Sequence, residues 1–263
     1  MAAIDASDPM ELGKAMTVDD ARLTPSPHPP SRGTLFGVGV GPGDPELMTV
    51  KAARLIASAK VIAYPTLAGS ASFARAIAAA EISDDIQEII MDVPMTVERE
   101  PAQQAYDAGA RQIAEALTRG EDVVCLCEGD PFFYGSFMYI FARLSGDFDV
   151  EVIPGVTSVT ACAARSRIPL AARNERLTIL PGPLNETELR VRIEGAESVA
   201  IMKVGRHLAK IRSVIDDLGL TEQAVYVERA SLPEEVVAPL ADAPEKAPYF
   251  SMILLTKGAD PWL

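Results

Sequence analysis

The sequence predicts an α/β protein built from two α/β domains. Its 263 residues suit one large domain or two medium ones, and 48% of them are apolar, which is enough for a substantial core. Short runs of β-branched residues alternate with helical segments, and this pattern favours a mostly parallel sheet covered by helices on both faces. A second series of such runs begins after Pro169, which indicates the second domain.

The first series follows a proline-rich leader. Residues 1–33 are predicted to be disordered, because four prolines lie between positions 25 and 30 and no apolar period runs through the segment. Asp44 and Pro45 occupy the positions of a helix N-cap and first helical residue, and Gly120 fits a helix C-cap. The predicted strands are 35–40, 61–64, 86–91, 123–127 and 150–153, and the predicted helices are 46–58, 70–80, 101–119 and 132–144.

The second series has fewer helices. Its predicted strands are 177–180, 199–202, 224–227 and 251–255, and its predicted helices are 186–193 and 206–218. The segment 232–248 carries four prolines and no clear helix, so we expect the last strands to pair antiparallel. The boundary is placed near residue 170, with a helical segment over 158–167 as the connection. This gives an N-terminal domain over 34–170 and a C-terminal domain over 171–263.

Charge and cysteine usage exclude several classes of protein. The formal net charge of −13 argues against a nucleic-acid partner. No stretch approaches the ~20 apolar residues of a membrane helix, and no signal peptide is recognisable, so no membrane partner is expected. Three cysteines favour a reducing cytoplasm over a disulfide framework. Cys125 and Cys127 share one strand face, where core packing is favoured over a metal site. With only His28 and His207, no metal site is predicted.

A glycine-rich turn, Gly37–Asp44, follows the first strand and invites comparison with nucleotide-binding loops. It lacks the third glycine of a dinucleotide fingerprint, since Pro42 or Asp44 stands at that position in the two possible registers. No glycine–lysine pair follows, which excludes a Walker loop. One interpretation is a purely structural turn. The other is a negative close-approach loop suited to a cationic or hydrogen-bond-donating ligand, of which a sulfonium is an example.

Two further polar loops follow strands of the same sheet. Glu128–Ser136 comes after the strand 123–127, and Pro154–Ser158 comes after the strand 150–153. Asp130 alone suits a capping residue, and Thr157 and Ser158 suit either capping or ligand binding. Ligands of parallel sheets bind at the carboxyl ends of strands, so the three loops together predict a cleft for a small, non-phosphate ligand.

Taken in order, these motifs resemble the tetrapyrrole methylase superfamily. GVGVGPGDPELMTVKA, EGDPFFYG and PGVTS match its three N-terminal signatures. The segments Val199–Ile211, Val225–Glu235 and Tyr249–Gly258 look like the branch that methylates carbon 20 of precorrin-2 in cobalamin synthesis. The resemblance runs from about residue 34 to the end of the chain. It implies a fold in which S-adenosylmethionine lies in a cleft between the two domains.

The resemblance also implies which residues contact the cofactor. By motif these are Pro42, Glu128, Gly129, Asp130, Phe133, Thr157, Ser158, Met202, Lys203 and Ala230. The superfamily usually has a tyrosine–methionine–glycine step where this chain has Met202–Lys203–Val204, which leaves the role of the Lys203 side chain open. Asp44 is the candidate general base, with an N-cap role as the alternative.

Substrate contacts are expected from Tyr134 and Arg206. Arginines also cluster near the connection at positions 165, 167, 173 and 176, where they suit either the carboxylates of a tetrapyrrole or a solvated connector. An alternative substrate is cobalt-loaded factor II, which the anaerobic route uses in place of metal-free precorrin-2. A further alternative is another tetrapyrrole methylase activity. The non-enzyme alternative is a module that only binds S-adenosylmethionine. Superfamily members are commonly dimeric, so we expect a cytoplasmic homodimer.

Overall fold

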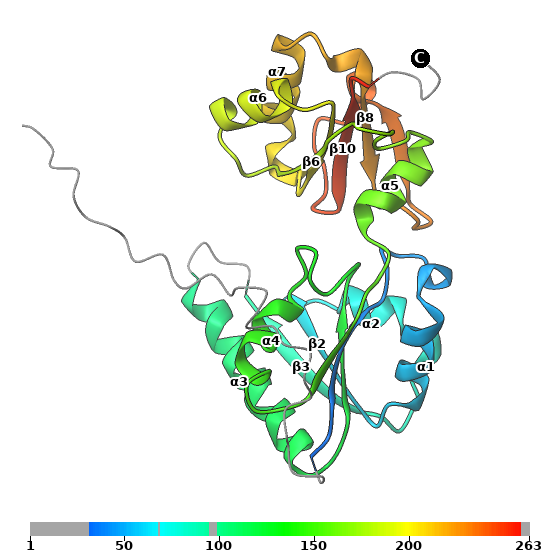
Figure 1. Cartoon of the computed structure of the whole chain (residues 1–263), viewed down its shortest axis with the longest axis vertical. Helices are drawn as coiled ribbons and strands as arrows, with labels where there is room; N and C mark the ends of the chain where they lie inside the picture. The colour runs from blue at the N-terminus through cyan, green and yellow to red at the C-terminus, as the bar shows by residue number, and fades with distance from the viewer. Residues whose placement is uncertain (1–31, 68, 95–98, 259–263) are drawn as a thin grey trace, which may run out of the picture.

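Two separate β-sheets, each covered by helices, make up the chain (Figure 1). The computed structural model describes residues 32–67, 69–94 and 99–258. Apart from Arg32 and Gly33, the predicted leader lies outside the described residues. The predicted two-part α/β architecture is confirmed.

The first sheet is entirely parallel, with the strand order β3-β2-β4-β1-β5. Its strands are β1 (Leu35–Gly39), β2 (Val61–Leu67), β3 (Gln87–Val93), β4 (Val123–Cys127) and β5 (Val150–Ile153). All five predicted strands are confirmed, with small shifts at their ends. Because β1 lies between β4 and β5, the loops that follow these three strands leave the sheet side by side.

Helices cover both faces of the first sheet, as predicted. They are α1 (Val50–Ser58) and α2 (Phe73–Ile77) on one face, and α3 (Glu100–Thr118) and α4 (Phe137–Leu144) on the other. Residues along β4 alternate between the two cores, with Cys125 and Cys127 facing α3 and α4, and Val124 and Leu126 facing α1 and α2. The predicted core position of both cysteines on one strand face is thereby confirmed.

Local hydrogen bonds set where several helices begin. Asp44 caps the 3-10 helix η1 (Pro45–Leu47), as predicted, but the continuous helix predicted over 46–58 is wrong. The helical backbone ends after η1, and a new helix, α1, begins at Val50. The Thr49 side chain caps α1 by accepting from the amide of Ala52. Ser72 caps α2, which is followed by η2 (Ala79–Glu81), so the helix predicted over 70–80 is shorter than expected.

The helix predicted over 132–144 is wrong in its first turn, since α4 begins only at Phe137. The preceding residues form an irregular loop around Asp130. At the end of α3 the prediction holds better, because Gly120 follows the last turn with a φ of 82°, the left-handed backbone expected of a terminating glycine.

The second sheet is mixed, with the order β6-β7-β10-β8-β9. Its strands are β6 (Leu177–Pro181), β7 (Ser198–Met202), β8 (Ala224–Glu228), β9 (Val236–Pro239) and β10 (Ser251–Thr256). Only β6 and β7 pair parallel, so the expected antiparallel pairing of the last strands is confirmed. The sequence interpretation missed β9, a short and largely exposed edge strand that ends at a proline.

Helices cover the second sheet on both faces as well. On one face lie α6 (Glu186–Glu194), η3 (Gly205–His207) and α7 (Leu208–Asp217), with the short helices η4 (Thr221–Gln223) and η5 (Leu240–Asp242) nearby. On the other face α5 (Ser158–Ser166) buries Val159, Ala161 and Cys162 against β8 and β10. Figure 1 shows α5 at the junction between the two sheets. The boundary near residue 170 stays a prediction.

No helix within residues 32–67, 69–94 and 99–258 combines the length and the apolar character needed to cross a bilayer.

Candidate functional site

A cleft of about 890 Å³, solvent at its mouth included, is lined by residues from both sheets. All ten predicted cofactor contacts line it, together with Tyr134. The remaining lining residues, which the sequence interpretation missed, are Phe73, Cys162, Val227, Arg229, Leu232, Tyr249, Phe250, Ser251 and Met252. The structure therefore gathers residues that are far apart in the sequence around one cavity.

Three loops from the first sheet form one wall, and hydrogen bonds join them. The amide of Gly129 donates to the carbonyl of Gly41 at 2.8 Å, and the amide of Gly41 donates back at 3.3 Å. The amide of Gly155, in the third loop, donates to Oδ2 of Asp130 at 3.0 Å. The loops that follow β1, β4 and β5 are thus held as one unit.

The Asp130 carboxylate organises the second loop. Its Oδ1 accepts from the amides of Phe132 at 2.9 Å and Phe133 at 3.1 Å, while its Oδ2 accepts from Gly155. Three backbone donors converge on one side chain, so its negative charge is offset locally. Asp130 does not cap α4. It shapes the loop whose Phe133 and Tyr134 line the cleft.

Two glycines allow these loops to approach one another. A Cβ atom on Gly155 would lie 2.0 Å from the carbonyl oxygen of Gly129, and one on Gly39 would lie 2.5 Å from the same atom. Any side chain at either position would push the loops apart. Close packing of the loop backbones therefore accounts for both glycines.

The second sheet provides the opposite wall. Met202 and Lys203 stand at the end of β7, and Arg229 and Ala230 follow β8. Because β10 runs antiparallel to both strands, its first residues and the preceding Tyr249 reach the same edge. The sequence predicts antiparallel pairing of the last strands. This pairing places the start of β10 beside the ends of β7 and β8, and so could have predicted that β10 begins at the cleft.

Aromatic contacts join the two walls. The ring centroids of Phe73, in α2, and Phe250, next to β10, lie 4.7 Å apart. The Nζ atom of Lys203 lies 5.4 Å from the ring centroid of Tyr134, which belongs to the loop after β4. Both contacts therefore connect lining residues of the first-sheet side with lining residues of the second-sheet side.

Strained backbone concentrates at this site. Tyr134, Lys203, Arg229 and Ser231 have φ values of 56°, 56°, 47° and 69°, in the left-handed region that favours glycine. The first three line the cleft, and Ser231 lies next to Ala230. Strain of this kind costs about 1–3 kcal/mol per residue and tends to persist where function requires it.

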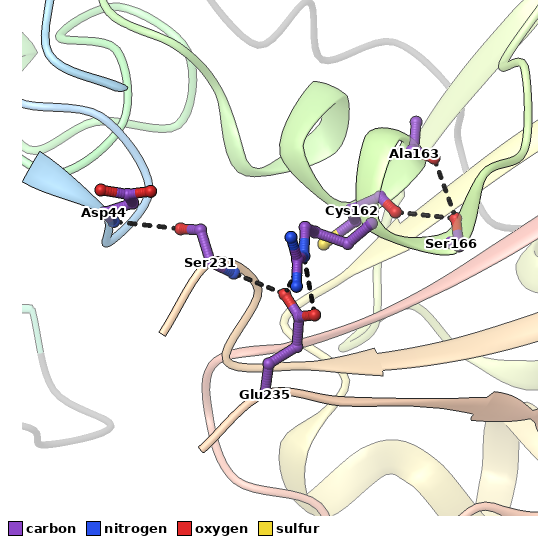
Figure 2. A network of polar contacts seen from close by, with 7 residues as sticks. Asp44, Cys162, Ala163, Ser166, Ser231 and Glu235 are labelled. Carbon is purple, nitrogen blue, oxygen red and sulfur yellow. Dashed lines mark hydrogen bonds and ion pairs between the residues drawn. The ribbon is translucent and has the colours of Figure 1, made fainter. Parts of the chain in front are cut away.

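A polar network ties the first loop to the second sheet (Figure 2). The amide of Asp44 donates to Oγ of Ser231 at 3.1 Å, and the amide of Ser231 donates to Glu235 at 2.7 Å. Nε of Arg165, in α5, donates to both carboxylate oxygens of Glu235, at 2.7 and 2.8 Å. The carboxylate partner of Arg165 is therefore a residue of this chain.

Asp44 and Arg206 lie outside the cleft lining. Oδ1 of Asp44 accepts from the amide of Glu46 at 2.9 Å, which confirms the predicted N-cap. Asp44 also lines an adjoining hollow that shares Leu232 with the cleft. Arg206 is exposed, with its Nε 3.5 Å from Nε2 of His207. The catalytic role of Asp44 and the substrate contact of Arg206 stay predictions.

Glu128 is the acidic group of the cleft whose charge is least compensated. Its side chain is accessible to solvent, but the surrounding cleft walls desolvate it and raise its pKa. Across the cleft, desolvation and the nearby Glu128 raise the pKa of Tyr249. A carboxylate in mainly apolar surroundings favours a cationic ligand. The described residues contain no cluster of His, Cys, Asp and Glu side chains that could hold a metal ion.

Comparisons with known proteins agree with the family resemblance of the sequence motifs. The family model of tetrapyrrole (corrin/porphyrin) methylases matches residues 34–244. The chain is 41% identical to a precorrin-2 C(20)-methyltransferase of Sinorhizobium sp., over 85% of this chain and 95% of that protein. It is 28% identical to a cobalt-precorrin-2 C(20)-methyltransferase of Salmonella typhimurium, over 86% and 97%.

A solved structure shares the fold. It is a uroporphyrin-III C-methyltransferase from Thermus thermophilus complexed with S-adenosylhomocysteine. The TM-score is 0.60 at 28% sequence identity, and the match covers 84% of this chain and 97% of that one.

Proposed function

Since the chain belongs to the tetrapyrrole methylase family, we propose that it transfers a methyl group from S-adenosylmethionine to carbon 20 of precorrin-2 in cobalamin biosynthesis. The observation that carries this proposal is the 41% identity to a precorrin-2 C(20)-methyltransferase over nearly the whole of that protein. The cleft supports it, because the residues that the resemblance implies for the cofactor lie around a single cavity.

The cleft is chemically suited to a sulfonium cofactor. The three loops after β1, β4 and β5 would present backbone groups and the Glu128 carboxylate, while Met202 and Ala230 would close the pocket from the second sheet. When bound, S-adenosylmethionine supplies an already activated methyl group. That the Thermus relative was solved with S-adenosylhomocysteine supports this choice of cofactor.

The protein then needs to orient two reactants and exclude water. A meso carbon of the tetrapyrrole is electron-rich, so placing it in line with the methyl group within ~3–3.5 Å provides much of the rate acceleration. Removal of a proton from the ring system is the remaining requirement, and Asp44 is the proposed base. Its place in the hollow that adjoins the cleft at Leu232 is compatible with that role.

Incubation with precorrin-2 and S-adenosylmethionine tests the proposal. Mass spectrometry should detect a tetrapyrrole heavier by one methyl group and an equivalent amount of S-adenosylhomocysteine. Faster turnover of the cobalt-loaded substrate would favour the anaerobic-route alternative. Cofactor binding without product from either substrate would indicate a binding module and refute the enzyme proposal.

Asp44→Ala should lower kcat about 100-fold while changing the affinity for S-adenosylhomocysteine little, as expected for loss of a general base. Alanine also removes the cap of η1, at a cost of about 1 kcal/mol. Asp44→Asn keeps a capping oxygen, so it should lose kcat without losing Tm. Equal losses of turnover and cofactor affinity in the alanine variant, with an active asparagine variant, would assign Asp44 a structural role.

Glu128→Gln should weaken binding of S-adenosylmethionine about fivefold more than binding of S-adenosylhomocysteine, because only the former carries a sulfonium charge. Calorimetric titration of both ligands measures this. Glu222→Gln is the control, since Glu222 is exposed and lies outside the cleft. Equal weakening for the two ligands would contradict an electrostatic role of Glu128.

The ligand-free Glu128→Gln protein has a second expected phenotype. The raised pKa of Glu128 means that the folded state binds this proton more tightly than the unfolded state. The carboxyl therefore favours folding at low pH, and this contribution is lost as the pH rises through the folded pKa. The variant should melt above the wild type at neutral pH, and the difference should vanish below the ordinary pKa of 4.5.

We propose that the protein is a cytoplasmic homodimer. The family resemblance supports the dimer, and the buried free thiols of Cys125, Cys127 and Cys162 suit a reducing compartment. Light scattering after size-exclusion chromatography measures the oligomeric state, and a monomeric mass at micromolar concentration would refute it.

A further inference from the structure

Lys203 places a positive charge in the cleft without an acidic partner. Its side chain is half-buried, and its Nζ lies over the ring of Tyr134 at 5.4 Å from the centroid. Across residues 32–67, 69–94 and 99–258, no carboxylate forms an ion pair with it. An ammonium held over an aromatic face keeps donors free for another acceptor.

The other nearby cations are engaged within the chain. Arg229, the second basic residue of the cleft lining, donates from Nη1 to Glu228 at 3.0 Å. Nζ of Lys210 donates to the carbonyl oxygens of Gly182, at 2.9 Å, and Leu184. Of the two cations in the cleft lining, Lys203 is therefore the one that has no ion-pair partner among the residues that the structure describes.

The backbone at Lys203 is unfavourable for a lysine. Its φ of 56° lies in the left-handed region, where glycine or asparagine is better tolerated. Tight packing holds this conformation, because the amide of Gly182 donates to the carbonyl of Met202 at 2.8 Å and a Cβ atom on Gly182 would lie 2.7 Å from the carbonyl oxygen of Lys203. Strained backbone of this kind is found at binding sites, and here it places the Lys203 side chain in the lining of the cleft.

We propose that Lys203 binds a carboxylate side arm of the tetrapyrrole, an inference that rests on the proposed function. A chain of net charge −13 repels a polycarboxylate, so the site needs a local cation. The lining has two acidic residues, Glu128 and Asp130. The charge of Asp130 is offset by three backbone donors, and Glu128 is the residue proposed to face the sulfonium of the cofactor. The ammonium of Lys203 can donate charge-assisted hydrogen bonds to a carboxylate of the substrate.

Three substitutions separate the charge from the backbone effect. Lys203→Gly and Lys203→Asn remove the ammonium and fit the left-handed backbone, whereas Lys203→Arg restores a cation. Lys60→Asn is the matched control, because it changes the net charge equally at an exposed site outside the cleft. The readouts are KM and kcat with precorrin-2, the Kd of uroporphyrin and of coproporphyrin by absorbance titration, the Kd of S-adenosylhomocysteine by calorimetry, and Tm.

The Gly and Asn variants should raise KM for precorrin-2 and the Kd of uroporphyrin about tenfold or more, with kcat changed less. The Arg variant should recover most of this loss, and Lys60→Asn should match the wild type. Uroporphyrin carries acetate and propionate arms, whereas coproporphyrin has methyl groups in place of the acetates. A smaller effect on coproporphyrin would assign Lys203 to an acetate arm, and an equal effect would assign it to a propionate. The Gly variant should melt at or above the wild-type Tm.

Unchanged tetrapyrrole binding in the Gly and Asn variants would overturn the inference. Weaker S-adenosylhomocysteine binding with unchanged tetrapyrrole binding would also overturn it, since the carboxylate would then belong to the cofactor. Wild-type protein that binds neither precorrin-2 nor uroporphyrin would overturn it too. If the wild type yields no methylated product but uroporphyrin binding depends on Lys203, the proposed reaction fails and the carboxylate site stands.

Discussion

Asp130→Ala should weaken the binding of S-adenosylhomocysteine about 100-fold, equivalent to about 2.7 kcal/mol. The Asp130 carboxylate accepts three backbone hydrogen bonds that hold two of the cleft loops together. Hydrogen bonds to a charged group contribute about 1.5–3 kcal/mol each, so their loss releases loops that a ligand must then order again. Calorimetric titration measures the affinity, and the melting temperature measures the accompanying loss of stability.

Asp130→Asn refines this test. The amide keeps one carbonyl oxygen for Phe132 and Phe133, but its NH₂ group then faces the donating amide of Gly155. The affinity should therefore fall between those of wild type and alanine variant. Asp84→Ala, at an exposed site before β3, should leave binding unchanged. Wild-type affinity in Asp130→Ala would show that the loops hold their shape without this carboxylate.

Gly155→Ala should destabilise the protein by about 3 kcal/mol or more, which lowers the Tm by roughly 6–12 °C. The new methyl group would lie 2.0 Å from the carbonyl oxygen of Gly129, and backbone, unlike a flexible side chain, cannot move aside without displacing the loop. Differential scanning calorimetry measures the effect. Cofactor affinity should fall as well, because Gly129 lines the cleft.

Gly146→Ala is the control for the glycine substitution. Nothing lies within 4 Å of a Cβ atom at this position, which is not left-handed. Its alanine variant should be unchanged or more stable by about 0.4–1 kcal/mol, because alanine restricts the unfolded chain. If both alanine variants melt alike, close packing of the loops is not what requires a glycine at position 155.

The first wall of the cleft, formed by the loops after β1, β4 and β5, could be predicted from the sequence alone. Once β1, β4 and β5 were recognised as strands, their following loops had to leave the same edge. The second wall was harder. Met202, Lys203 and Ala230 were located only through the family resemblance, and Tyr249 and Phe250 were missed because their place depends on how β10 pairs.

Side-chain hydrogen bonds and tertiary contacts explain the errors. Apolar residues near Phe132 suggested a helix, and Asp130 does accept from the amides of Phe132 and Phe133 as an N-cap would. The left-handed backbone of Tyr134, with a φ of 56°, interrupts that turn, so α4 starts only at Phe137. The left-handed backbone of Tyr134 and Lys203 leaves no mark in composition, and at Lys203 it is held by packing against Gly182, a residue 21 positions away in the sequence. The predicted helix over 206–218 likewise did not anticipate η3, in which Arg206 is exposed.

The described chain passes from the first sheet to the second only once, between β5 and α5. A ligand seated between the loops and the end of β7 would thus add to the few non-covalent contacts that join the two halves, such as those of Asp44 with Ser231 and of Phe73 with Phe250. Its binding energy would then also resist their separation, by an amount that grows with the logarithm of its concentration above Kd. Cellular supply of the cofactor would set not only how fast this protein works but how long it survives proteolysis.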